Sequence, residues 1–225
     1  MGRPELLGSS GLESNDREVD KRYTLLPLRK LDLARDSREL YQDLSAYYNL
    51  LTNPKNRIHY ANPPIDASDL KQRLLHDRTH TYLSENKLGS TVAGGGINDA
   101  AENEHDHFLV KVVIDPELQG HGMGRRFIAG LVDKAFHERT DDGRIRTKLD
   151  AAIIRDVPEW DRMPRALRSL GFKFVHYLPN QITIVDQESG VEKTQPTERW
   201  EILREDWMRM RRRIDIRDIL SQLQQ

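Results

Sequence analysis

Two short segments of the sequence carry residue types that could act on a ligand. The first is a glycine-rich turn, Gln119-Gly120-His121-Gly122-Met123-Gly124, and the second is the run Glu104-His105-Asp106-His107. Glycines at alternate positions let the backbone approach a ligand closely, and a turn that opens a helix presents amides that attract anions. We therefore expect the turn to hold a phosphate or pyrophosphate, with charge added by Arg125 and Arg126.

The second segment offers two carboxylates and two imidazoles, which are groups that take a proton from an amine. Histidine titrates near neutral pH without perturbation, so His107 is the first candidate base and Glu104 the second. A solvated loop would have the same composition, and that alternative stays open. No metal site is expected, because His105 and His107 would point to opposite faces of a strand and no further ligand follows at a recognisable spacing.

The elements around the glycine turn are those that would position it. Residues 108–114 are β-branched and apolar on both faces except at Lys111, which predicts a strand in the middle of a sheet. After the turn, apolar residues recur at helical spacing from Phe127 to Ala135. A strand, a turn and a helix thus form one unit. An ordinary tight connection between a strand and a helix is the alternative to a ligand site.

The spacing of the turn separates several phosphate-binding motifs. A nucleotide-hydrolase loop needs Gly-Lys-Ser/Thr, which the turn lacks, and a dinucleotide fingerprint that starts at Gly122 needs glycine or alanine at Phe127. The pattern that remains, Gln119-x-x-Gly122-x-Gly124 directly after a buried strand, resembles the coenzyme-A-binding motif of the GNAT superfamily of N-acetyltransferases. Residues 167–172, which end in Gly-Phe, resemble the family's later helix and the strand after it.

The resemblance implies a mixed α/β (α+β) architecture, the GNAT acyl-CoA N-acyltransferase fold, with a splayed, mostly antiparallel central sheet flanked by helices. It implies acetyl-CoA as cosubstrate, with the pantetheine arm along the motif strand and the pyrophosphate on the turn. The implied cofactor-binding residues are Val112, Val113, Ile114, Gln119, Gly120, His121, Gly122, Met123, Gly124, Arg125 and Arg126. An amine of a small molecule or a protein would attack the thioester directly, and a backbone amide near Val113 or Ile114 would stabilise the oxyanion.

The chain departs from the family's pattern at one position that matters for chemistry. Many members carry a tyrosine four residues before the glycine of Gly-Phe, where it protonates the departing thiolate, and this chain has Leu167. We assign no general acid, because Ser169, Tyr177 or water could serve and a thiolate needs little help near neutral pH. The departure keeps open a second function, a non-catalytic acyl-CoA-binding regulatory module on the same fold.

The chain divides into three parts by composition. Residues 1–21 are polar and lack an apolar period, so we expect a flexible tail; residues 22–205 form the acetyltransferase domain, and residues 206–225 a basic helix packed on it or extending from it. Besides the motif strand, we expect strands at 23–28, 79–84, 88–97, 149–154, 172–177, 181–186 and 199–203. We expect helical segments from Leu31 to Tyr48, around 68–75 and over 163–170, and a loop over 187–198.

Composition restricts the partners and the location. Of the 225 residues, 37% are hydrophobic and 32% are charged, and no run approaches the roughly 20 apolar residues of a spanning helix, so no membrane is expected. The absence of cysteine excludes thiolate catalysis and thiolate metal sites, and a cytoplasmic location is the default. A net charge of −1 disfavours nucleic acid as a partner, although arginines cluster between Arg209 and Arg217. Residues 181–197 could pair two subunits in a homodimer.

Overall fold

The computed structural model describes residues 25–57, 63–99, 107–155, 161–185 and 192–212. In these residues seven strands form one sheet in the order β1-β2-β3-β4-β5-β7-β6. The strands are β1 (Arg29–Lys30), β2 (Thr79–Glu85), β3 (Thr91–Asn98), β4 (Phe108–Ile114), β5 (Lys148–Ile154), β6 (Lys173–Val185) and β7 (Glu192–Leu203). The helices are α2 (Arg38–Thr52), α3 (Pro54–Arg57), α4 (Ala67–His76), α5 (Met123–His137) and α6 (Arg162–Ser169), with a 3-10 turn at Pro116–Leu118. None of the described helices is long and apolar enough to cross a membrane.

The sheet is antiparallel except between β4 and β5, and this pair is short. The recorded partners are Phe108 with Asp150 and Leu109 with Ala151, after which β4 continues beside β3 and β5 continues beside β7. The two parallel strands therefore diverge toward their carboxyl ends. This is the splayed, mostly antiparallel sheet that the sequence predicts.

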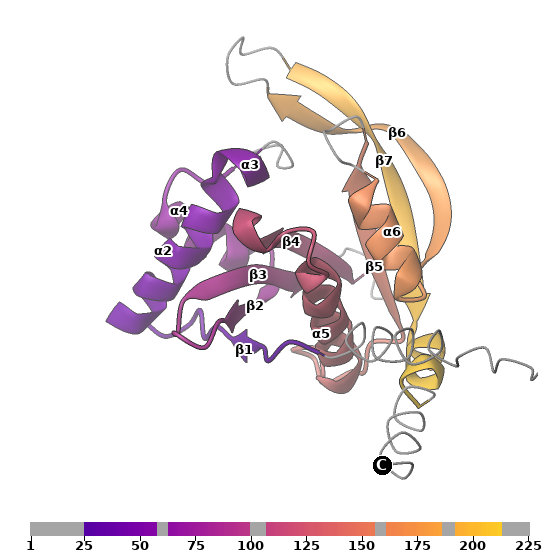
Figure 1. Cartoon of the computed structure of the whole chain (residues 1–225), viewed down its shortest axis with the longest axis horizontal. Coiled ribbons are helices and arrows are strands. Elements are labelled where there is room, and N and C mark those ends of the chain that lie inside the picture. The colour runs from indigo at the N-terminus through magenta and orange to yellow at the C-terminus, as the bar shows by residue number, and fades with distance from the viewer. Residues whose placement is uncertain (1–24, 58–62, 100–106, 156–160, 186–191, 213–225) are drawn as a thin grey trace, which may run out of the picture.

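Two apolar clusters cover the sheet. The larger one packs α5 and α6 against the sheet through residues such as Phe127, Leu149 and Trp200. The smaller one packs α2 and α4 through residues such as Leu44 and Leu70. Figure 1 shows α2 and α4 together on one side and α6 alongside β6 and β7. Helices α2 and α4 each bury one stripe, as expected of amphipathic helices, whereas α5 buries six consecutive residues, 127–132, and is therefore covered on most sides.

Most predicted elements are confirmed, but the region before α2 is different. Residues 25–28 form no regular strand, because Pro27 offers no amide to a neighbour, and β1 follows at Arg29–Lys30. The helix starts at Arg38 rather than near Leu31, since the Ser37 hydroxyl accepts a hydrogen bond from the Leu40 amide (3.2 Å). Leu31 is buried in the smaller cluster without being helical. Its apolar spacing reflects packing, not a helix.

The region after α6 also differs from the prediction. The strands expected at 172–177 and 181–186 are one strand, β6, with a register shift between Leu178 and Ile182. The loop expected over 187–198 is wrong for its last seven positions, since β7 begins at Glu192, and residues 187–191 lie outside the described part. Pro196 is tolerated because it lies at the register shift between β7 and β6, between Gln195 and Thr197, where it has no strand partner in β6. Its carbonyl still accepts a hydrogen bond from the Arg155 amide (3.0 Å).

The described part of the predicted basic segment, residues 206–212, belongs to a helix that begins at Arg204 and lies against the domain. Trp207 is 1% exposed in the larger cluster, and its indole N–H donates to Asp133 of α5 (3.2 Å). The predicted arginine-rich helix therefore packs on the domain over these residues. Arg217 lies outside the described part.

Three consecutive glycines in β3 determine how closely the helices approach the sheet. A Cβ atom built on Gly94 would overlap the ring of Tyr47 from α2, and one on Gly95 would lie 3.0 Å from Phe127 Cε1 of α5. Gly94 thus leaves a slot that the fully buried Tyr47 side chain occupies. The glycines are required by close packing on both faces, since none of the three has positive φ.

Replacing Gly94 with alanine should destabilise the fold by about 1–3 kcal/mol, because the added methyl group overpacks against Tyr47. Gly124→Ala is the matched control, since a Cβ there lies 3.6 Å from Ile114 Cγ1, an ordinary contact. The free energy of unfolding measured by denaturant titration checks the difference. Equal stability of the two variants would show that Tyr47 can move out of the slot at no cost.

Candidate functional site

The glycine turn lies between β4 and α5, as the sequence predicts, and the 3-10 turn at Pro116–Leu118 separates it from the end of β4. Gly120 and Gly122 adopt φ of 83° and 76°, the left-handed region in which a side chain is strained. Gly122 is the N-cap of α5, and no side-chain hydrogen bond caps the helix in the described residues. Around both glycines the space for a Cβ is open, with Arg125 Nη2 at 3.9 Å the nearest atom to that of Gly122. The turn presents exposed backbone at the N-terminus of a 15-residue helix, which is the positive end of the helix dipole.

Two side-chain amides fix the start of the turn. Gln119 Nε2 donates to Asn56 Oδ1 (2.7 Å) and to the Ile114 carbonyl (3.2 Å), and Asn56 Nδ2 donates to the same carbonyl (3.1 Å). Asn56 lies in α3, is 2% exposed, and also donates to Leu50 O (2.8 Å). The Gln119 side chain therefore holds the last carbonyl of β4. The sequence does not predict a role for Asn56, because nothing in the residues around Asn53-Pro54 indicates a contact with Ile114, 58 residues away.

The middle of β4 is irregular at the point where it leaves β5. Gly96 pairs with Val110 and Gly94 pairs with Val113, so two residues of β4, Lys111 and Val112, lie opposite Gly95 alone. This is a β-bulge, and Lys111 takes φ of 52° within it. Bulges redirect peptide groups away from the ladder, so the implied pantetheine-binding residues Val112, Val113 and Ile114 begin at the bulge.

The other predicted residue with chemistry, His107, lies at the opposite end of β4 in a buried polar cluster. His107 Nδ1 lies 2.9 Å from Asp99 Oδ1, and His80 Nε2 lies 2.9 Å from Asp99 Oδ2. Arg146, with a side chain 1% exposed, binds both oxygens of Asp99, with Nε at 2.8 Å from Oδ1. Arg146 Nη1 also donates to the carbonyls of Ala135 (3.2 Å) and Glu138 (3.1 Å) at the end of α5. Asp99 thus joins β2, β4 and the residues before β5.

The electrostatics of the cluster fix its protonation. Burial raises the pKa of Asp99, but hydrogen bonds from His107, His80 and Arg146 outweigh it and hold that pKa well below its usual range. Asp99 is therefore a carboxylate and accepts from every partner. His107 accordingly carries its proton on Nδ1, which leaves Nε2 as the basic nitrogen.

Some of the predicted residues are brought together and others are not. The predicted cofactor-binding residues, from Val112 to Arg126, form one continuous path along the C-terminal half of β4 and into α5. His107 is not part of this path: it precedes Val113, an implied oxyanion residue, by six positions, and it lies next to the two residues that pair with β5. Glu104 lies outside the described residues. Leu167, at the position of the family's tyrosine, is a core residue 1% exposed.

The face of the sheet opposite α5 carries a second charged group at the point of divergence. Asp150 of β5 is fully buried and lies 3.0 Å from Arg199 Nη2 of β7 and 3.3 Å from Lys148 Nζ. The Arg199 guanidinium lies over the Phe108 ring of β4, 5.5 Å from its centre. Asp150 faces away from α5, since its neighbours Leu149 and Ala151 belong to the α5 cluster and side chains alternate along a strand.

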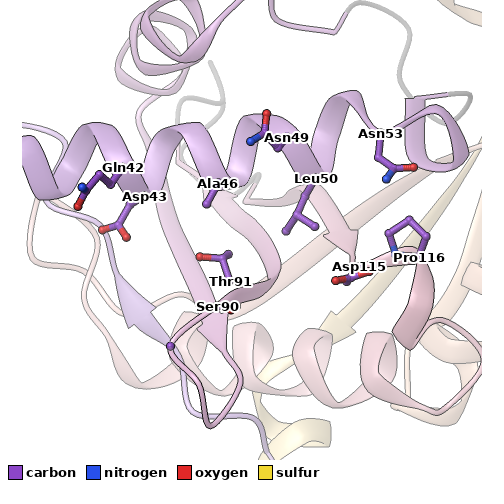
Figure 2. Close-up of a pocket in the computed structure, with 11 residues that line it drawn as sticks. Gln42, Asp43, Ala46, Asn49, Leu50, Asn53, Ser90, Thr91, Asp115 and Pro116 are labelled. Atoms are coloured by element: carbon purple, nitrogen blue, oxygen red, sulfur yellow. The ribbon is translucent and has the colours of Figure 1, made fainter.

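A polar groove of about 530 Å³ lies between α2 and the turn from β2 to β3 (Figure 2). It reaches the site only at Asp115 and Pro116, directly after β4. Both oxygens of Asp43 in its wall are bound by Arg29, at 2.6 and 2.7 Å. The groove includes none of the residues from Gly120 to Arg126, so we do not assign it to the cofactor. In the described residues no group of three or more acidic or histidine side chains is arranged to hold a metal ion.

Replacing Asp99 with asparagine should lower the free energy of unfolding at pH 7 by about 3–5 kcal/mol, because it leaves the buried Arg146 charge unpaired. A carboxylate with a depressed pKa stabilises the fold above its unfolded value near 4, and this contribution is lost as pH falls further. The wild type should therefore lose stability below about pH 4 more steeply than the variant.

Denaturant titrations between pH 3 and pH 7 check this prediction. Asp141→Asn is the control, since that carboxylate is 74% exposed and 3.5 Å from His80. It should change stability by no more than about 0.5 kcal/mol. Parallel pH curves for the wild type and Asp99→Asn would contradict the assignment of Asp99 as a buried carboxylate.

Comparisons with known proteins place the fold and the family. A comparison with curated proteins finds no match. Among solved structures, the chain is similar to a spermidine N-acetyltransferase from Vibrio cholerae in complex with CoA and spermine. The TM-score is 0.61 at 19% identity, over 81% of this chain and 98% of that one. It is also similar to a ribosomal-protein-alanine N-acetyltransferase from Brucella melitensis, with a TM-score of 0.56 at 19% identity over 79% and 99% of the two chains.

These likenesses show the fold, and the sequence itself shows the family. Residues 38–150 match the model of the acetyltransferase (GNAT) family, and this match begins at α2 and runs through the glycine turn into β5. It therefore contains the bulge, the turn and the Asn56–Gln119 contact. The chain belongs to the acetyltransferase (GNAT) family and is a transferase of mixed α/β fold.

Proposed function

We propose that the protein transfers an acetyl group from acetyl-CoA to a primary amine of a small molecule or a protein, by direct attack of the amine on the thioester. The observation that carries this proposal is the open glycine turn at Gly120–Gly124. It lies at the start of α5 and follows β4, the strand that diverges from β5. Family membership supports acetyl transfer, and one similar structure holds CoA.

The cofactor would follow the path that the sequence predicts. The pyrophosphate would accept hydrogen bonds from amides of residues 120–126, where the helix end favours negative charge. The pantetheine arm would lie along Val112, Val113 and Ile114, in the place that β5 vacates when it leaves β4. Pairing with an extended arm suits a strand whose outer edge has lost its neighbour.

The acceptor would approach from the face opposite α5. Phe108, Asp150 and Arg199 lie there at the point where β4 and β5 diverge. Holding the amine and the thioester together supplies most of what direct acyl transfer requires, apart from removal of a proton. The two similar structures are those of a spermidine N-acetyltransferase and a ribosomal-protein-alanine N-acetyltransferase. An acceptor panel should therefore include polyamines, other small amines and peptide N-termini.

The wild type should release CoA from acetyl-CoA with at least one amine of that panel, and Gly122→Val should abolish acetyl-CoA binding. The valine side chain would occupy the open space that the pyrophosphate is proposed to fill. Calorimetric affinity for acetyl-CoA and mass spectrometry of acetylated products measure the two effects.

Gly143→Val is the matched control for Gly122→Val. Gly143 also has positive φ (83°) and no atom within 4 Å of its Cβ position, but it lies in the turn between α5 and β5. Each variant should lose about 1–2 kcal/mol of stability from backbone strain, and only the first should lose the cofactor. Equal acetyl-CoA affinities would refute the placement of the pyrophosphate. A wild type that binds acetyl-CoA but acetylates nothing would favour the non-catalytic alternative.

We propose His107 as the general base, as the sequence suggests, with Glu104 second. The contact of its Nδ1 with the Asp99 carboxylate supports this role, because it holds the ring in place and leaves Nε2 basic. The ring is largely buried, at 11% side-chain exposure, so a proton would pass to it through water. The general acid stays unassigned; Ser169 donates its hydroxyl to Ala166 O (2.7 Å), and the Tyr177 ring packs against Arg155.

Replacing His107 with glutamine should lower kcat by about 100-fold and remove the acid limb of the pH profile, with little change in acetyl-CoA affinity. His80→Gln is the control, because His80 makes the same kind of contact with Asp99 at a similar burial. Initial rates between pH 6 and pH 9.5 measure both variants. Identical losses in the two variants would show that the cluster is structural and that another group or water removes the proton.

A cytoplasmic location, the absence of a nucleic-acid partner and the pairing of two copies stay predictions from the sequence. So do the absence of a metal and the division of the chain at residues 21 and 205.

A further inference from the structure

A hydrogen bond from outside the sheet reaches the backbone of the bulge in β4. The Tyr47 hydroxyl, from the middle of α2, donates to the carbonyl of Lys111 over 2.7 Å. Lys111 is in the left-handed region, where a residue with a side chain is strained, so its conformation persists only if the surroundings determine it. The Tyr47 side chain is fully buried, and its ring lies in the slot above Gly94, the strand partner of Val113.

A second contact holds the same residue from α4. Lys111 Nζ lies 3.0 Å from a carboxylate oxygen of Asp77, the residue that caps the end of α4. The backbone and the side chain of Lys111 are thus bound to different helices. Both contacts lie on the face of the sheet opposite α5.

The direction of the Lys111 carbonyl fixes that of the amide that follows it. The peptide bonds of the described chain are trans, and in a trans peptide the C=O and the N–H point in opposite directions. Because the carbonyl of Lys111 points toward α2, the N–H of Val112 points away from α2. A hydrogen bond accepted by the carbonyl also polarises the peptide and strengthens its N–H as a donor.

We propose that Tyr47 is a positioning residue for acyl transfer: through the Lys111 carbonyl it orients the bulge peptide whose amide faces the thioester. This inference rests on the proposed function, and it adds a residue of α2 that no motif marks. Charge develops on the thioester oxygen during attack, and a donor held in advance stabilises that charge at no cost of reorganisation. Loss of the Tyr47 hydroxyl removes the contact that directs the Lys111 carbonyl, while the contacts of Asn56 and Gln119 at the start of the glycine turn stay in place.

Tyr47→Phe tests the proposal, because it keeps the ring in the Gly94 slot and removes only the hydroxyl. We expect kcat to fall about tenfold while the affinities for CoA and acetyl-CoA stay within about twofold. The pH profile should keep its shape, since no group that takes the proton is removed. Tyr48→Phe is the control; the Tyr48 hydroxyl donates to Ile65 O, also over 2.7 Å, and lies on the same helix.

The experiment measures kcat, both affinities and thermal stability for the wild type, Tyr47→Phe and Tyr48→Phe. A selective loss of kcat in Tyr47→Phe supports the proposal. An unchanged kcat in Tyr47→Phe, or a kcat that falls in step with CoA affinity or equally in Tyr48→Phe, overturns it. Failure of the proposed function itself is distinct, because the wild type would then neither bind acetyl-CoA nor acetylate any amine.

Discussion

The site depends on the separation of β4 from β5 after two paired residues. A parallel pair that continued would cover the edge of β4 with backbone and would leave no room beside the bulge. Two features determine where the strands separate. At one end, Asp99 holds them together, because it binds His107 at the start of β4 and Arg146 just before β5. At the other end, β5 takes its partners from β7 along its whole length. The opening is therefore a property of the pairing pattern.

The two ends of β4 are stabilised by different physics. At the N-terminal end of β4 lies a buried ionic cluster, in which one carboxylate accepts hydrogen bonds from an arginine and two histidines. Such a cluster is costly to break, because every member that is removed leaves another polar group without a partner. At the C-terminal end of β4, the Ile114 carbonyl accepts neutral hydrogen bonds from Asn56 and Gln119, and an exposed glycine turn follows. Rigidity at the base and accessible backbone at the tip suit a strand that must hold its shape while a ligand lies beside its end.

The sequence predicts the part of the molecule in which chemistry and local structure coincide. Gln119-x-x-Gly122-x-Gly124 follows a buried strand, and the positive φ of Gly122 is the conformation for which glycine is needed. The strands from β2 to β5, with α4 and α5, also follow from apolar periodicity. The contacts that hold the site are different. Tyr47 looks like one more apolar position of an amphipathic helix, and Asp99 like an ordinary polar residue after a strand. Their partners Lys111 and Arg146 lie 64 and 47 residues away in sequence. The errors have local causes: Pro27 prevents a strand where the pattern favours one, and a register shift between β6 and β7 accommodates Pro196 where the pattern favours a loop.

The shared carbonyl of Ile114 links two segments that the chain order keeps apart. Asn56 belongs to α3, in the connection between α2 and α4, whereas Gln119 belongs to the turn after β4, and each donates to that one oxygen. A displacement of α3 would consequently pull on the glycine turn, even though no covalent path shorter than 58 residues joins Asn56 to Ile114. A substitution in the connection between α2 and α4 that displaces Asn56 would therefore also shift the start of the glycine turn.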